Sequence, residues 1–269
     1  MLGLALVIAL LGAACSSGSS SSSATTTTPP AAIPGFTTVT PGVLTVGSQL
    51  PAPPFWNGDN GQTVDSGFEY DLVQRLAQQF GLSRVEVVQA SFGDVVAGRM
   101  CTCDLFVAQV YASDARRQVI DLSSTYLDAG QGVLVLDGSA VRLTTFADAA
   151  NYRWGVRDGA VAVSMLQVVG VTPKQYATNA ALYQALTTGD IDAVLLDLPL
   201  LYGSISTAEV SGVSVIAQVP GGGYSAALAK GSANTALVDQ ALARLRADGT
   251  LDDLSATYLR TPATPVPSL

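Results

Sequence analysis

The sequence contains no histidine. This absence excludes histidine-dependent catalytic triads, histidine general bases and histidine-ligated metal sites. Charged residues make up only 13% of the 269 residues, and the formal net charge is -8. Because phosphate backbones are bound by clustered lysine and arginine, nucleic acid is not expected as a partner. No phosphate-binding or nucleophile motif stands out either, so we expect no cofactor, no metal and no enzymatic activity.

Cysteine is also rare, with three residues in the chain. Cys101 and Cys103 form a Cys-x-Cys pair, which lacks the two further ligands that a zinc site needs. In an oxidising compartment the pair could form a small disulfide. Two half-buried thiols on a strand are an equal alternative.

The third cysteine follows an apolar segment at the start of the chain. Residues 1–14 contain no polar residue but are too few to span a membrane, which takes about 20 residues. They are typical of an export signal, and Leu11 to Cys15 resemble a bacterial lipoprotein cleavage site. We therefore predict a signal peptide (1–14), a lipidated Cys15 and a Ser/Thr/Pro-rich tether (15–38), which together place the protein outside the cytoplasm on the cell membrane. Two departures are the lack of a preceding Lys or Arg and the presence of Gly12; the alternative is a core helix.

Beyond the tether, apolar strand patterns alternate with helical patterns in two successive series. Such alternation predicts an α/β fold, here two lobes, each a mostly parallel sheet flanked by helices, with a cleft between them. The expected strands are 43–46, 84–88, 104–107, 131–136, 152–156, 191–196, 213–219 and 224–229, and the expected helices are 71–80, a short one capped by Ser113, 160–169, one capped by Asn179, 235–247 and 251–259.

Ligands in such sheets bind at the carboxyl ends of strands, beside helix N-termini. Arg116 follows one strand, and its planar fork matches a carboxylate. Asp197 ends an apolar strand, where it either caps the next helix or binds a cation. A surface location is the alternative for Arg116, although the neighbouring Arg117 fits that role better. Phe55 follows two prolines, which either present it to a ligand or form a turn that caps the core. An Arg, an Asp and aromatics such as Phe55 and Phe92 together suit a zwitterionic amino acid.

Ordered motifs over about residues 40 to 260 resemble the family 3 extracellular solute-binding proteins, the polar amino-acid receptors of ABC importers. The motifs are GVLTVG (42–47), PPF (53–55), GFEYDL (67–72), SDARRQVIDLS (113–123), GVRDG (155–159) and LTTGDIDAVLLD (186–197), followed by GTL (249–251) and YL (258–259).

The resemblance implies a two-lobed periplasmic-binding-protein fold of type II. It places lobe 1 at 39–134 plus 221–260 and lobe 2 at 135–220, with crossovers near 133–137 and 218–223 and a loose tail at 261–269. It also implies roles for single residues. These are Arg116 for the ligand carboxylate, Asp197 for the ammonium, Gly159 and Ala160 for backbone N–H donors, and Phe55 and Phe92 for pocket aromatics.

Three positions depart from the family pattern. Gln109 stands where Gly is usual, Tyr111 where Thr is usual, and Ala160 where Thr is common. These changes affect the identity of the ligand rather than the fold. Arg157, often Lys in relatives, is a candidate for contacting an acidic ligand side chain.

The resemblance implies a monomeric receptor that closes on a small-molecule ligand, an amino acid above all, and delivers it to an ABC-transporter permease. Three alternatives remain. The lobes could report ligand to a membrane signalling partner. They could form a cleft enzyme such as a dehydratase, with Glu69 and Asp71 as the early acidic pair. They could also be a degenerate, adhesin-like pair without ligand.

Overall fold

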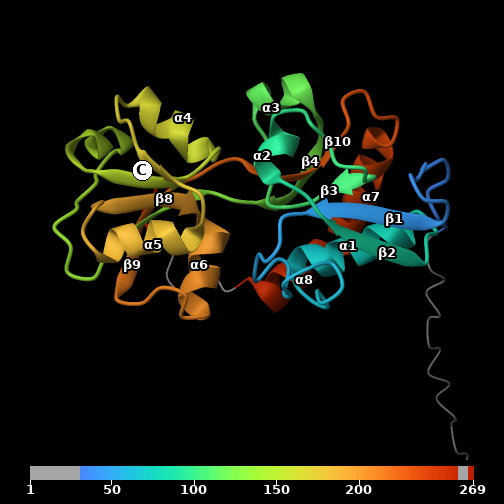
Figure 1. The fold of residues 1–269 in the computed structure, drawn as a ribbon, viewed down its shortest axis with the longest axis horizontal. Coiled ribbons are helices and arrows are strands. Elements are labelled where there is room, and N and C mark those ends of the chain that lie inside the picture. The colour runs from blue at the N-terminus through green and yellow to red at the C-terminus, as the bar shows by residue number, and fades with distance from the viewer. Residues whose placement is uncertain (1–30, 260–265) are drawn as a thin grey trace, which may run out of the picture. The chain divides into compact units, whose positions relative to one another are not determined.

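The structure is a computed structural model that describes residues 31–259 and 266–269. The predicted signal peptide, Cys15 and most of the tether lie outside the described residues. The described chain forms two α/β lobes (Figure 1). Their elements are β1 Val43–Ser48, α1 Phe68–Gln79, β2 Arg84–Gln89, α2 Phe92–Val96, β3 Leu105–Phe106, α3 Asp114–Val119, β4 Asp121–Asp128, β5 Gln131–Leu136, η1 Phe146–Asn151, β6 Trp154–Arg157, α4 Val161–Val168, β7 Lys174–Tyr176, α5 Asn179–Thr187, β8 Ala193–Asp197, α6 Leu198–Ser206, β9 Val213–Val219, β10 Gly223–Leu228, α7 Thr235–Ala247 and α8 Thr250–Tyr258.

The first lobe is built on a five-stranded sheet with the order β2-β1-β3-β10-β4. Strand β1 pairs in parallel with β2 and β3, whereas β10 runs antiparallel to β3 and β4. Every residue of β1 is buried, as expected for a strand covered on both faces. Leu72 of α1, Val238 of α7 and Leu251 of α8 belong to one core cluster, while Val95 of α2 and Phe106 of β3 belong to another. Helices therefore cover both faces of this sheet.

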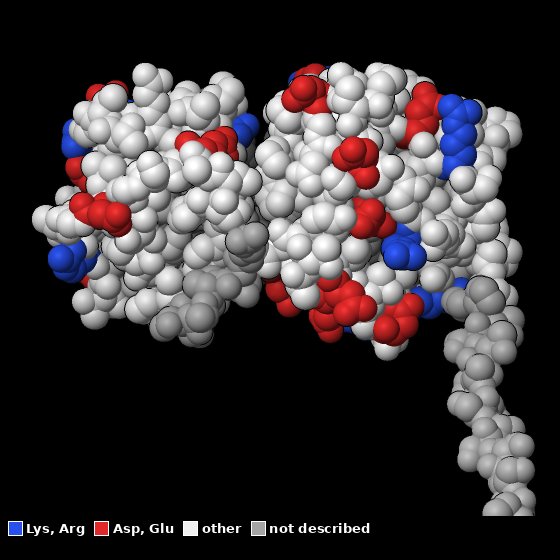
Figure 2. Space-filling model, turned by 90° about the horizontal axis from the view of Figure 1, so that it is seen from below, with Lys and Arg blue, Asp and Glu red and all other residues white. Residues whose placement is uncertain are grey.

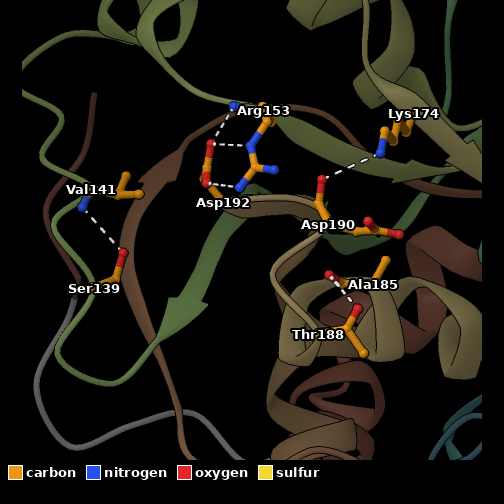
Figure 3. Close-up of polar contacts among 8 residues, drawn as sticks. All are labelled: Ser139, Val141, Arg153, Lys174, Ala185, Thr188, Asp190 and Asp192. Carbon is orange, nitrogen blue, oxygen red and sulfur yellow. Dashed lines mark hydrogen bonds and ion pairs between the residues drawn. The ribbon is translucent and has the colours of Figure 1, made fainter.

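The second lobe repeats this plan with the order β7-β6-β8-β5-β9. Strand β6 is parallel to β7 and β8, and β5 is antiparallel to β8 and β9. The starts of β6 and β8 are joined by Arg153 and Asp192, whose Nη2 and Oδ1 atoms lie 2.6 Å apart (Figure 3). The same carboxylate accepts a hydrogen bond from the Arg153 backbone N–H at 2.8 Å, so it aligns the starts of these two neighbouring strands.

These observations confirm the predicted α/β class and two-lobed fold. Each sheet is mixed rather than mostly parallel, because one half of each is antiparallel. The polar sequence of β4 and the helix α6 gave no clear sequence signal. The cap of α5 is Thr178, whose hydroxyl accepts the Ala181 N–H, and not Asn179, which is the first helical residue.

The first crossover between the lobes lies earlier than predicted. Strand β4 ends the contribution of the first lobe at Asp128, and β5 belongs wholly to the second sheet from Gln131 onward. The crossover is therefore at 129–130, not near 133–137, and lobe 1 stops before residue 134. The second crossover, at 220–222 between β9 and β10, falls inside the predicted range of 218–223.

Both ends of the described chain pack more closely than predicted. Ile33 is 1% exposed in the core of the first lobe, and Phe36 stacks on Phe80 with ring centroids 4.0 Å apart. Residues 266–269 are not a loose tail. The Gln218 N–H donates to the Pro267 carbonyl at 2.8 Å, and the Leu269 N–H donates to the Gln218 carbonyl at 2.9 Å. The C-terminus is thus held against β9 of the second lobe.

Cys101 and Cys103 form a disulfide, with Cα atoms 5.3 Å apart. This resolves the two alternatives that the sequence left open. Both cysteines pack beside the cluster around Phe106. Among the described helices, none has the length and apolar character to cross a bilayer.

Candidate ligand-binding cleft

A cavity of about 620 Å³ lies between residues of the two lobes, and Figure 2 shows a furrow between the lobes on one face of the molecule. The first lobe contributes the loop after β1, the start of α2 and the loop after β3. The second lobe contributes the loop after β6, the start of α5, the end of β8 and residues of α6 and beyond. Seven of the nine predicted ligand-binding residues line it: Phe92, Gln109, Tyr111, Arg116, Arg157, Ala160 and Asp197.

Arg116 is buried at the cavity wall, with 8% exposure. Helix α3 positions it, because the Ser113 hydroxyl accepts the Arg116 N–H at 3.3 Å as an N-cap. Its Nη1 donates to the Tyr111 carbonyl at 2.6 Å and its Nη2 to the Gly159 carbonyl at 2.9 Å, and the guanidinium lies 5.3 Å from the centre of the Phe92 ring. No ion pair among the described residues includes it. Burial lowers the pKa of Arg116, and the negative charge of Asp197 raises it.

Asp197 closes β8 and faces the same cavity. It occupies the N-cap position of α6, but its side chain makes no capping hydrogen bond. Instead the carboxylate accepts hydrogen bonds from Gln131 Nε2 and, at 2.8 Å, from Tyr224 Oη. Burial raises the pKa of Asp197, while these hydrogen bonds and the Arg116 charge lower it. The side chain of Asp197 therefore does not cap α6, which was one of the two sequence-based alternatives.

The chain matches the model of the bacterial extracellular solute-binding proteins, family 3, over residues 44–261. It belongs to this family. The family is one of binding proteins, which agrees with the expected absence of enzymatic activity.

The chain is also similar to individual amino-acid-binding proteins. The L-cystine-binding protein TcyJ of Escherichia coli (strain K12) is 31% identical over 225 residues, which cover 81% of this chain and 82% of that protein. A solved structure of an ancestral arginine-binding protein bound to arginine is 25% identical, with a TM-score of 0.69, and the match covers 81% of this chain and 98% of that one. A solute receptor for L-cysteine from Neisseria gonorrhoeae shares the fold at 22% identity, with a TM-score of 0.68 over 81% of this chain and 90% of that one.

The unusual Gln109 of this solute-binding protein is held from inside the first lobe. Its φ of +51° lies in the left-handed region, where glycine is favoured. Its backbone N–H donates to Oε1 of the fully buried Glu69 at 2.8 Å, and its side-chain amide donates to Oε2. These two bonds hold a non-glycine residue in this conformation, and they turn the amide toward Glu69.

Tyr111 connects the cleft to the second crossover. Its hydroxyl donates to the Gly221 carbonyl, and its own carbonyl accepts from Arg116. Gly222 has a φ of +76°, and a Cβ atom there would lie 1.7 Å from Tyr111 Oη. Glycine at this crossover is therefore required by both the backbone conformation and the close approach of Tyr111.

Two of the predicted ligand contacts need correction. Phe55 is fully buried in the core, with its ring centroid 5.9 Å from that of Phe68 and 5.7 Å from that of Tyr224. It does not line the cavity; it packs against Tyr224, which in turn bonds to Asp197. Gly159 does not line the cavity either.

Of the two expected backbone donors, only the Ala160 N–H is already used by a partner within the chain. Gly159 offers its carbonyl to Arg116, and the Ala160 N–H donates to the Arg157 carbonyl at 3.1 Å. The Gly159 N–H has no hydrogen-bond partner among the described residues, so its role as a donor to the ligand stays a prediction. Glu69 and Asp71, the acidic pair of the enzyme alternative, do not line the cavity, and Asp71 accepts the Tyr258 hydroxyl at 2.7 Å.

Several residues of the site had no recognisable sequence signal. Gln131 and Tyr224 hold Asp197, yet they come from β5 and β10, far from it in sequence. The one hint in the sequence was the polar Gln131 at the start of an apolar strand. In the structure its side chain is only 1% exposed. Thr178, Asn179 and Glu209 also line the cavity, from the start of α5 and the loop after α6.

Proposed function

We propose that the cleft binds an amino acid as a zwitterion, with its α-carboxylate on Arg116 and its α-ammonium on Asp197. The observation that carries this is one cavity lined by both groups, Arg116 from the first lobe and Asp197 from the second. Neither group has a charged partner within ion-pair distance among the described residues. A buried guanidinium without a carboxylate partner favours a ligand that supplies one.

Ligand binding in this proposal favours closure of the lobes. A ligand that touches both lobes stabilises the arrangement in which both contacts exist, and the equilibrium shifts toward it. The crossovers at 129–130 and 220–222 are the segments about which such a motion would occur, and Tyr111 links the second of them to Arg116. An ABC-transporter permease would receive the closed, loaded receptor, and the receptor would act as a monomer.

The ligand class is supported by the similar proteins described above. They are named for L-cystine, arginine and L-cysteine, which share an α-carboxylate and an α-ammonium. The common part of these molecules matches Arg116 and Asp197 in charge. The remaining cavity residues would then distinguish one side chain from another.

A calorimetric titration of the purified full chain carrying Cys15→Ala tests this function. At least one amino acid should bind and raise the thermal midpoint, since a ligand that binds only the folded state adds about 2.7 kcal/mol at a hundredfold excess over its Kd. The same compound without its α-carboxylate, or without its α-amine, should bind at least about tenfold more weakly. Equal binding of all three compounds, or no binding of any amino acid, would contradict the proposal.

We also propose that Cys15 carries lipid and anchors the protein to the bacterial cell membrane after removal of residues 1–14. The support is the apolar segment before Cys15 and the polar tether after it. In cells fed radiolabelled palmitate, the wild-type chain should carry label and sediment with membranes. The Cys15→Ser variant should carry none and remain in the supernatant. Labelled Cys15→Ser, or unlabelled wild type, would refute the anchor.

A further inference from the structure

We propose that the cavity holds a second zwitterion subsite, in which Arg157 binds a second carboxylate and Glu209 a second ammonium. The ligand class would then be a bis-amino acid, which carries an α-amino and α-carboxyl group at each end. This inference rests on the proposed function, because Arg116 and Asp197 hold the first end.

Arg157 lies at the end of β6 and lines the cavity. Its Nη1 donates to Asn179 Oδ1 at 2.7 Å, which fixes the direction of the guanidinium. Its Nε is buried and has no hydrogen-bond partner among the described residues. No ion pair among these residues includes Arg157. Its Nη2 also has no hydrogen-bond partner among the described residues, so this cavity-lining guanidinium keeps donors for a carboxylate from the ligand.

Two helix N-termini face the cavity beside this arginine. Thr178, Asn179 and Ala180 at the start of α5 line it, as do Ala160 and Val161 at the start of α4. The first N–H groups of a helix have no intrahelical acceptor, and the helix dipole favours negative charge there. Arg157 and the two helix starts therefore favour an anion at the same end of the cavity.

Glu209 supplies the opposite charge. Its Oε2 accepts the Ser204 hydroxyl at 2.6 Å, and Ser204 accepts the Tyr183 hydroxyl at 3.0 Å, so the carboxylate is oriented by a short chain of hydrogen bonds. It lines the cavity and belongs to no ion pair among the described residues. Its negative charge acts on Arg157 without pairing with it.

The two acids reach the cavity from different ends of α6. Asp197 precedes α6, and Glu209 follows it, with the Glu209 N–H donating to the Ser204 carbonyl at 2.9 Å. Asp197 is therefore separated from Glu209 by most of a nine-residue helix, which is roughly 10 Å at a rise of about 1.5 Å per residue. The cavity volume of about 620 Å³ lies within the range of roughly 300–1,000 Å³ that suits drug-sized ligands. Two separate amino-acid ends fit this spacing and volume better than one.

Four amino acids serve as probes that test the second subsite apart from the first. They share one α-amino and α-carboxyl group and differ only at the opposite end of the molecule, called the far end. Diaminopimelate carries a far carboxylate and a far ammonium, aminopimelate only the carboxylate, lysine only the ammonium, and norleucine neither. Calorimetry on the full chain with Cys15→Ala should give diaminopimelate the highest affinity, about tenfold to a hundredfold above norleucine. L-cystine has the same two ends and should behave like diaminopimelate.

Charge-removing variants then assign the subsite. Arg157→Ala should weaken the two probes with a far carboxylate by about tenfold or more, and Glu209→Gln the two with a far ammonium. The exposed Arg117→Ala, whose guanidinium donates to the Leu122 carbonyl, is the matched control and should keep the ratio of diaminopimelate to norleucine affinity.

The outcomes distinguish this inference from the proposed function. Equal affinity for diaminopimelate and norleucine, or equal effects of both variants on all four probes, would overturn the second subsite and leave the amino-acid receptor intact. Aminopimelate binding as tightly as diaminopimelate would overturn the role of Glu209. Failure of every amino acid to bind would overturn both proposals together.

Discussion

Replacing Arg116 by alanine is expected to reduce amino-acid affinity by about 30-fold to several thousandfold, which corresponds to roughly 2–5 kcal/mol. The guanidinium is 8% exposed, lies against Phe92 and is oriented by the Tyr111 and Gly159 carbonyls. A ligand carboxylate that closes onto an alanine instead would lose its hydration without gaining a charged partner. Isothermal titration with the best ligand from the amino-acid screen measures the loss directly.

Two further variants separate charge from geometry at this position. Arg116→Lys keeps the positive charge but loses the planar fork, so it should recover only part of the affinity. Arg117→Ala removes an exposed arginine of the same helix and should leave the affinity within about twofold of wild type. Wild-type affinity in Arg116→Ala, with an unchanged thermal midpoint, would show that the ligand carboxylate binds elsewhere.

The sequence was most informative where a residue occupies one end of a regular element. Arg116 and Asp197 were predicted because each follows a recognisable strand, at the edge where α/β sheets bind ligands. The structure places both at one cavity. Ser113 was likewise predicted as a helix cap, and its hydroxyl accepts the Arg116 N–H. Local chemistry of this kind depends on a few neighbouring residues.

Features that depend on packing between distant segments could not be predicted in this way. Phe55 was predicted as a pocket aromatic, but contacts with Phe68 and Tyr224 bury it completely in the core. The link between Asp197 and Tyr224 joins β8 to β10 across 27 positions in the sequence. The crossover at 129–130 was also missed, because only two residues separate two strands that belong to different sheets.

Two of the three departures from the family pattern, Gln109 and Tyr111, have physical explanations in the structure. Gln109 takes a backbone conformation that glycine adopts more readily than other residues. Its two hydrogen bonds to Glu69 offset the cost of that conformation. Tyr111 fits because Gly222 leaves space for its hydroxyl. Each departure therefore depends on a partner that lies distant in sequence, and each affects the wall of the cavity rather than the fold.

The Glu69→Ala variant should lower the free energy of unfolding by about 3–5 kcal/mol, the usual cost of removing one partner of a buried charged network. Glu69 is fully buried and accepts hydrogen bonds from Trp56 Nε1, Tyr126 Oη and both the backbone and side-chain amides of Gln109. Alanine would leave four donors without this acceptor, and two of them belong to the buried Trp56 and Tyr126. Urea unfolding measures the loss, and the slope of the unfolding free energy against urea concentration should be the same in the variant and the wild type.

The exposed Glu86 gives the matched control for that measurement. Its nearest cation is Arg84, with Nη2 and Oε2 atoms 3.6 Å apart, and Glu86→Ala should cost less than about 1 kcal/mol. Similar losses in the two variants would contradict a special role for the buried carboxylate. A loss of ligand affinity in Glu69→Ala beyond its loss of stability would show that Gln109 needs this anchor to shape the cavity wall.

The pH dependence of stability gives an independent test of the same buried group. Burial raises the pKa of Glu69 from 4.5 to about 7, although the hydrogen bonds from Tyr126, Gln109 and Trp56 lower it. Since the folded state then holds this proton more tightly than the unfolded chain, its stabilising contribution is complete below the unfolded pKa of 4.5 and is lost as the pH rises through about 7. The unfolding free energy of the wild type should therefore fall, relative to the non-titrating Glu69→Gln, between about pH 5 and pH 8. No change over that interval would mean that the four donors keep the carboxylate ionised in the folded state, because a pKa at or below 4.5 moves its pH dependence to more acidic conditions.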